Sequence, residues 1–203
     1  MKDYVNQQRQ NHGFLTEEAL IATVGSRNSV LSPSSTLISE EIIIGQDNLF
    51  YPNVVIERSG ESEVTIGDGN IFYPGVYVLG SMGKIAIGNG NEFGPAGITI
   101  KANMPAACIE IGDNGRYADD AIIMGCTKLG NGSQVLGAIT VQNCTLDPGG
   151  NYREADPNNR AAVLKGFGLA RGISLQMGQV INGAGNFSDA PVELQQTYHP
   201  SKK

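Results

Sequence analysis

The chain has no tryptophan, only two histidines and three cysteines, and charged residues make up just 17% of its 203 residues. No apolar run approaches the roughly 18 residues that a membrane span needs, so we expect no membrane partner. Residues 1–5 lack the apolar core of a signal peptide. Three cysteines without a CxxC pair favour reduced thiols over a disulfide framework. These absences predict one soluble, cytoplasmic domain.

The charge balance is acidic, with 14 Lys and Arg residues against 20 Asp and Glu residues and a formal net charge of -6. The basic residues are scattered along the chain, and only Lys202 and Lys203 are adjacent. Proteins that bind nucleic acids usually carry a basic stripe or patch. We therefore expect neither DNA nor RNA as a partner.

Glycine is abundant: 27 of the 203 residues are glycine, about 13% against roughly 7% in an average protein. Twenty-five of these glycines lie between Gly45 and Gly185, and many belong to a recurring phrase of the type Ile-Gly-Asp-Gly-Asn. The phrase begins at Ile44, Ile66, Ile87, Ile111 and Leu129, and its first glycines are 22, 21, 24 and 18 residues apart. Such an internal repeat predicts a repetitive architecture.

Within each phrase the large apolar residues recur with a period of six. The longest uninterrupted series is Ile111, Tyr117, Ile123, Leu129, Val135 and Val141. Two residues before each of these comes a second inward position, occupied by Ile109, Gly115, Ala121, Thr127, Ser133 and Ile139. Inward positions two apart predict a short strand, and Gly, Asn and Asp supply the turns that follow. Three such units predict a triangular coil of 18 residues.

This pattern resembles the hexapeptide-repeat superfamily, and the resemblance covers roughly residues 36–146. It implies an all-β fold, a left-handed parallel β-helix, assembled as a homotrimer. Residues 1–35 lack the repeat, and we expect an N-terminal cap there, with a short helix that begins after Thr16 and ends at Gly25. Residues 147–203 are expected to form a C-terminal cap or a subunit contact.

Stacking successive coils predicts columns of like residues. Phe50, Phe72, Phe93 and Tyr117 should stack inside the coils, and Asn48, Asn70 and Asn91 should form a hydrogen-bonded ladder. Pro52, Pro74 and Pro95 should lie at a corner, because proline has no N–H to donate. Cys108, Cys126 and Cys144 are 18 residues apart and should stack at another corner. A straight column does not converge on a metal ion, so we expect no metal site there.

Extra residues interrupt the repeat in three loops, Glu57–Glu63, Leu79–Lys84 and Lys101–Ala107, which should project from one corner. Insertions in repeat proteins often cluster on a binding face. The candidate ligand-binding residues are Lys101, Asn103, Arg116 and Asp119. The last segment adds Arg153, Arg160, Lys165 and Arg171, which would serve either contact with an anionic ligand or a cap and subunit contact.

The resemblance implies acyl or acetyl transfer to a small molecule at a subunit interface, with acyl-CoA as a substrate and a histidine as general base. The two histidines, His12 and His199, both lie outside the repeat, so no catalytic residue is assigned. A three-histidine metal site cannot be assembled from two histidines. Two interpretations stay open at this point: a hexapeptide-repeat transferase-like enzyme, or a non-catalytic ligand-binding or structural trimeric solenoid.

Overall fold

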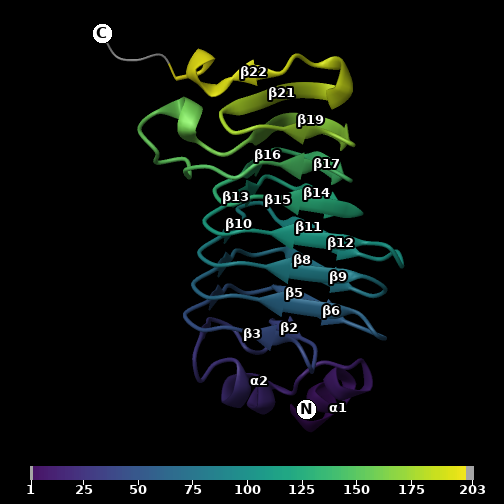
Figure 1. Cartoon of the computed structure of the whole chain (residues 1–203). Helices are drawn as coiled ribbons and strands as arrows, with labels where there is room; N and C mark the ends of the chain where they lie inside the picture. The colour runs from purple at the N-terminus through teal and green to yellow at the C-terminus, as the bar shows by residue number, and fades with distance from the viewer. Residues whose placement is uncertain (1, 200–203) are drawn as a thin grey trace.

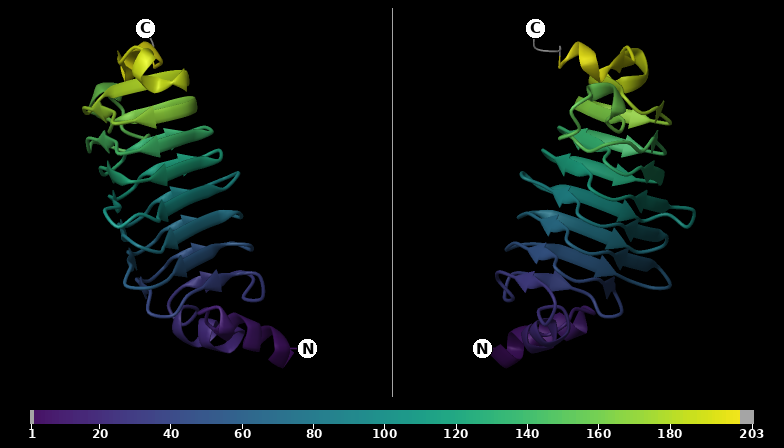
Figure 2. Two further views of the ribbon diagram at one scale, coloured as in Figure 1. Left: turned by 90° about the vertical axis from the view of Figure 1, so that its right-hand side faces the viewer. Right: turned by 60° about the vertical axis from the view of Figure 1, so that its left-hand side comes forward.

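The computed structural model describes residues 2–199 and has the shape of an elongated stack (Figures 1 and 2). Two helices, α1 (Lys2–Asn11) and α2 (Glu17–Thr23), lie at one end of the stack (Figure 1). The rest of the regular structure consists of strands and three short 3-10 turns. None of the helices within residues 2–199 has the length and apolar character needed to cross a membrane.

The strands form a parallel β-solenoid with three faces. The first face contains β1 (Ser29–Val30), β4 (Leu49–Phe50), β7 (Ile71–Phe72), β10 (Glu92–Phe93), β13 (Arg116–Ala118) and β16 (Gln134–Leu136). The second contains β2 (Leu37–Ile38), β5 (Val55–Arg58), β8 (Val76–Gly80), β11 (Ile98–Ala102), β14 (Ala121–Met124) and β17 (Ile139–Gln142). The third contains β3 (Ile43–Ile44), β6 (Glu63–Ile66), β9 (Lys84–Ile87), β12 (Cys108–Ile111), β15 (Cys126–Leu129), β18 (Thr145–Leu146) and β20 (Ser174–Leu175).

The predicted aromatic column fills the interior of the solenoid. Phe50, Phe72, Phe93 and Tyr117 pair in register from coil to coil and are fully buried. Their ring centroids are 5.0, 5.1 and 5.3 Å apart, with nearly parallel planes. This spacing follows the separation of neighbouring strands, which is about 4.8 Å. The Tyr117 hydroxyl lies 3.0 Å from Ser133 Oγ, so its polar end is satisfied inside the core.

The predicted asparagine ladder is also present. Asn48, Asn70 and Asn91 are buried, and each side-chain Oδ1 accepts from the backbone N–H of the next coil at 2.8 to 2.9 Å. Asn70 Nδ2 donates to Asn48 Oδ1 at 3.0 Å and to the Gly88 carbonyl at 2.9 Å. Amide side chains suit this position because they both donate and accept.

The corner phrase uses glycine for close approach and for positive φ. A Cβ on Gly88 would lie 2.4 Å from Asp113 Oδ1 and 2.8 Å from the Gly112 carbonyl oxygen. Two residues later Gly90 has φ 66°, a region that favours glycine. The predicted proline corner holds as well, because Pro52, Pro74 and Pro95 each precede a residue of positive φ, namely Asn53, Gly75 and Ala96.

The N-terminal segment contains more helix than the sequence analysis predicted. Thr16 caps α2 as expected, because its side-chain oxygen accepts from the Ala19 N–H at 3.1 Å. The longer helix α1 was not predicted, because its residues have little apolar periodicity. Arg9 of this helix is buried and donates to the carbonyls of Leu15, Pro33 and Thr36 at 2.6, 3.1 and 2.7 Å. These three bonds fasten α1 to the first coil.

The predicted cysteine column is wrong at its last member. Cys108 and Cys126 are register partners, but Cys144 falls opposite Thr127 and is fully buried. The cause is a coil that is one residue short, since Leu129 pairs with Leu146 instead of with residue 147. Cys144 Sγ donates to the Ala170 carbonyl at 3.2 Å, and burial raises the pKa of its thiol.

The six-residue period stops after Leu146, yet parallel pairing continues. The Gly149 N–H still donates to the Asn131 carbonyl of the preceding coil at 3.0 Å, and residues 151–160 then leave the stack and contain the short turn η1 (Pro157–Asn159). The chain returns as β19 (Val163–Arg171), which pairs with both β16 and β17 and so joins the first and second faces. β21 (Gln179–Asn186) stacks on β19. The remaining elements are η2 (Phe187–Asp189), β22 (Glu193–Leu194), which is antiparallel to β21, and η3 (Gln195–Thr197).

Candidate functional site

A cavity of about 280 Å³ lies against the first face, near the C-terminal end of the stack. Strands β13, β16, β19 and β21 form its floor, and residues 152–160 and 195–199 form its walls. The lining residues are Arg116, Gln134, Leu136, Tyr152, Arg160, Val163, Lys165, Val180, Gln195, Tyr198 and His199. The cavity therefore exists only where the chain leaves the regular coil.

Hydrogen bonds hold the two walls in place. Asp156 caps η1 by accepting from the Asn158 N–H at 3.0 Å. Asn158 Nδ2 then donates to Gln196 Oε1 at 2.8 Å, which links one wall to the other. Gln195 is buried and its Nε2 donates to the Ala161 carbonyl at 2.7 Å. The walls are thus built into the fold.

Three basic side chains, those of Arg116, Arg160 and Lys165, line the cavity, and no lining residue within 2–199 is Asp or Glu. The ion pairs formed within the same part of the chain are Arg58–Glu41, Lys84–Glu63 and Lys128–Glu110, so they use none of these cations. Glu92 is the register partner of Arg116 on β10, but it does not line the cavity. The site therefore holds excess positive charge.

Aromatic rings lie beside these cations. The Arg116 guanidinium carbon lies 5.5 Å from the centre of the Tyr152 ring, and that of Arg153 lies 5.0 Å from it. The Lys165 ammonium nitrogen lies 5.9 Å from the Tyr198 ring centre. Cation–π contacts of this length restrain the charged groups without neutralising them. Within residues 2–199 the Arg116 guanidinium and the Lys165 ammonium donate no side-chain hydrogen bond, whereas Arg160 Nε donates to the Glu154 carbonyl at 2.8 Å.

The C-terminal tail contributes a phenol and an imidazole to the rim. The Tyr198 hydroxyl donates to Glu193 Oε2, and this hydrogen bond raises the pKa of Tyr198. The backbone N–H of His199 donates to the Gln195 carbonyl at 3.2 Å. The tail thus brings His199, one of the two histidines of the chain, to the cavity.

The four candidate residues of the sequence analysis do not form one site within a single chain. Arg116 alone among them lines the cavity. Lys101 lies near the end of β11 on the second face, and Asn103 follows in an exposed turn. Asp119 is exposed at the corner between β13 and β14, where its φ is 65°. Different faces and corners therefore carry these residues.

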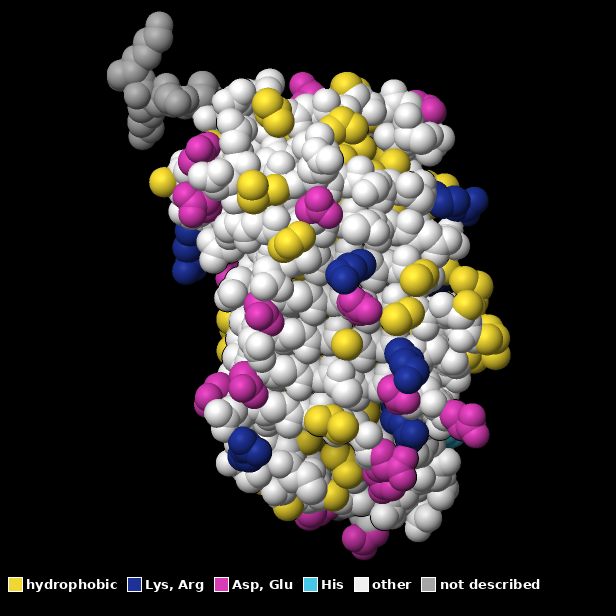
Figure 3. All heavy atoms as spheres, in the orientation of Figure 1, with side chains coloured by type: hydrophobic (Ala, Val, Ile, Leu, Met, Phe, Trp, Pro, Cys, Tyr) yellow, Lys and Arg dark blue, Asp and Glu magenta, His cyan; other side chains and the backbone are white. Residues whose placement is uncertain are grey.

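The three insertions do project from one corner, between the second and third faces. The register pairs β5, β8 and β11 in sequence, and likewise β6, β9 and β12, so their connecting loops lie on adjacent coils. Lys or Arg and Asp or Glu side chains alternate down one side of the molecule (Figure 3), in keeping with the ion pairs Lys84–Glu63 at 2.9 Å and Lys128–Glu110 at 3.4 Å.

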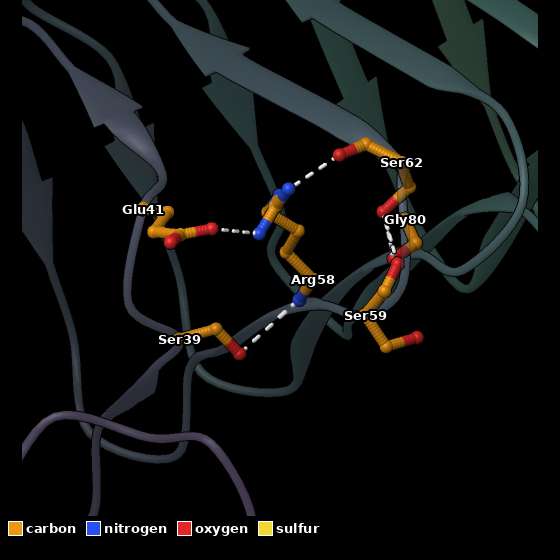
Figure 4. Close-up of polar contacts among 6 residues, drawn as sticks. All are labelled: Ser39, Glu41, Arg58, Ser59, Ser62 and Gly80. Carbon is orange, nitrogen blue, oxygen red and sulfur yellow. Dashed lines mark hydrogen bonds and ion pairs between the residues drawn. The ribbon is translucent and has the colours of Figure 1, made fainter.

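Arg58 organises the first of these loops (Figure 4). Its Nε donates to the Ser62 carbonyl at 2.8 Å, and its guanidinium pairs with Glu41. Its backbone N–H donates to Ser39 Oγ at 3.1 Å. Ser62 Oγ donates in turn to the Gly80 carbonyl of the next coil at 2.7 Å. Because these groups already satisfy one another, the cluster serves to hold the loop.

Sequence reasoning missed the combination of Arg116 with Tyr152, Arg160 and Lys165. The period of six placed Arg116 outward but carried no information on the path of residues 147–160. The available signals were the break in the repeat and the four basic residues that follow it. β16 pairs with β13 on one side and with β19 on the other. This return of the chain places Lys165 on the same face as Arg116, two coils away.

No protein-family model matches the sequence, and no curated protein matches it at a significant level. Within residues 2–199, no group of three or more His, Cys, Asp or Glu side chains is arranged to hold a metal ion.

Proposed function

We propose that the protein binds a small anionic molecule in the cavity of Arg116, Arg160 and Lys165. The observation that carries this proposal is the gathering of three cations without a lining carboxylate among the described residues. Like charges that line one cavity repel one another. An anion relieves that repulsion and accepts charge-assisted hydrogen bonds from the guanidinium groups.

Stabilisation by inorganic phosphate tests this proposal. At constant ionic strength, millimolar phosphate should raise the Tm of the wild-type protein, because a ligand that binds only the folded state stabilises it. Arg116→Gln should remove most of this rise. Arg171→Gln is the matched control, because Arg171 is exposed and pairs with Gln142 away from the cavity. Equal stabilisation of all three proteins, or none in any, would refute the proposal.

A second candidate function is acyl transfer from acyl-CoA to a small molecule, and it rests on the position of His199 in the cavity. An imidazole there would remove a proton from a hydroxyl or amine as it attacks the thioester. Release of free thiol from acetyl-CoA, measured with a panel of small alcohols and amines, tests it. His199→Asn should abolish the release and His12→Asn should not. If acetyl-CoA is neither bound nor consumed, anion binding alone remains.

The recurring phrase and the parallel solenoid together support membership of the hexapeptide-repeat superfamily. With it we propose a left-handed coil, a cap formed by residues 1–35, a cap or subunit contact formed by residues 147–203, and a cytoplasmic homotrimer. Light scattering coupled to size-exclusion chromatography tests the assembly. A mass of three chains, each of 21.5 kDa, is expected, and the mass of one chain would contradict it.

A further inference from the structure

Gln134 is the polar side chain at the centre of the cavity floor. It lies on β16, between β13 with Arg116 and β19 with Lys165, and in register with Arg116. It is only 7% exposed, and none of the side-chain hydrogen bonds formed within residues 2–199 uses its amide. Within residues 2–199 the buried side-chain polar atoms without a partner are Thr36 Oγ1 and Asn158 Oδ1, so the Gln134 amide is not sealed in the core. It is open to the cavity, where its N–H donors are available to a polar ligand.

The rest of the floor is apolar. Leu136, Val163 and Val180 line the cavity beside Gln134, and both valines are buried. A ligand that fits must therefore present an anionic group to the cations and a short apolar body to this floor. The volume of about 280 Å³ lies just below the roughly 300–1,000 Å³ of pockets that enclose drug-sized molecules. The enclosed part of the ligand is accordingly compact.

We infer that the ligand is a small molecule whose head carries two negative charges, and that the Gln134 amide donates a hydrogen bond to that head. This inference rests on the proposed function. A single carboxylate would leave most of the charge of Arg116, Arg160 and Lys165 uncompensated. A head with two charges offers oxygens both to these cations and to Gln134 Nε2. A phosphomonoester and a malonate-type dicarboxylate, with both carboxylates on one carbon, share this chemistry.

Calorimetric titration of the full chain with matched anions tests the inference. The dianions are phenyl phosphate and phenylmalonate, and the monoanions are methyl phenyl phosphate and phenylacetate, all at one ionic strength. Each dianion is compared with the monoanion of its own class. At least one of the two dianions should bind about tenfold more tightly than its monoanion, as expected from one additional charge-assisted contact. Comparison of the phosphate pair with the carboxylate pair shows which of the two chemical classes the site prefers.

Two variants probe the role of Gln134. Gln134→Leu should lower dianion affinity about tenfold, because it removes one charge-assisted donor. Gln134→Glu keeps the size of the side chain but adds a negative charge, so it should abolish dianion binding even if the leucine variant folds poorly. Gln142→Leu on β17 is the control, because Gln142 pairs with Arg171 outside the cavity.

The outcomes separate this inference from the proposed function. A dianion preference that is lost in both Gln134 variants supports it. Equal affinity for monoanions and dianions overturns it while leaving anion binding intact. Unchanged dianion affinity in Gln134→Glu also overturns it. Absence of binding by every anion in the panel overturns both proposals together.

Discussion

The regular coils from Ile44 to Leu146 and the irregular segment from 147 to 199 use polar side chains in opposite ways. In the coils, Asn70 is buried and each of its polar groups meets the coil above or below. Beside the irregular segment, Gln134 is also buried, but its amide faces a cavity. A regular register satisfies its own polar groups, so a binding site requires a break in that register.

The same contrast holds for charge. Along the third face, Lys84 and Glu63 are register partners and neutralise one another at 2.9 Å. In the cavity, Arg116 and Lys165 come from strands two coils apart, with Gln134 and Leu136 between them. Charges in adjacent coils can compensate each other, whereas charges gathered by an irregular return of the chain remain available to a ligand.

The largest expected effect comes from the inner aromatic column. Phe72→Ala should lower the free energy of unfolding by about 3–5 kcal/mol, because it opens a cavity between two stacked rings. Tyr73→Ala is the matched control, since Tyr73 lies outside the inner column, stacks on Tyr51 at 5.0 Å and is partly exposed. Urea denaturation measures both. Similar losses in the two variants would show that the inner column carries no special share of the stability.

The asparagine ladder should give the next largest effect. Asn70→Ala leaves the Asn91 N–H and the Gly88 carbonyl without their partners inside the core. Each unsatisfied buried group costs about 1–3 kcal/mol, so the total loss for the two groups should be about 2–6 kcal/mol. Asn103→Ala, at an exposed loop position, should change stability by less than about 0.5 kcal/mol. A neutral Asn70→Ala would contradict the structural role of the ladder.

The wall of the cavity should be less sensitive than the coils. Gln195→Ala removes the bond to the Ala161 carbonyl and should cost about 1–2 kcal/mol. The effect should be local, so hydrogen exchange should rise in residues 193–199 while the coils stay protected. Gln176→Ala, at an exposed position, is the control. Loss of protection throughout the coils would show that the two regions unfold as one unit.

Periodicity predicted the coils well and the cavity poorly, for a physical reason. Phe50, Phe72 and Phe93 occupy equivalent positions because each coil repeats the same local geometry, and a repeat can be read from spacing alone. Cys144 shows the limit, since one missing residue turned an expected corner position into a buried one. Lys165 shows it further, because its approach to Arg116 depends on the path of residues 147–162, which have no period.

The smallest expected effects concern the pKa values of two tyrosines whose hydroxyls each donate to a glutamate carboxylate. On the second face, Tyr77 donates to Glu57 at 2.8 Å, and partial burial together with this carboxylate raises the pKa of Tyr77 to about 12. In the tail, the hydrogen bond to Glu193 is the main cause of the raised pKa of Tyr198. Burial is thus the largest cause of the raised pKa in the coil, and the carboxylate is the largest cause in the tail.

Near-ultraviolet titration of tyrosinate, assigned with Tyr→Phe variants, tests this difference. Glu193→Gln should remove the larger part of the rise in the pKa of Tyr198, because the hydrogen bond to Glu193 is its main cause. Glu57→Gln should lower the pKa of Tyr77 only in part, because its burial persists. An unfolded tyrosine loses its proton near pH 10, before the folded Tyr77 does, so the stability that Tyr77 contributes is complete below that pH and falls as pH rises toward about 12. If both substitutions shifted their tyrosines equally, burial would not distinguish the coil from the tail.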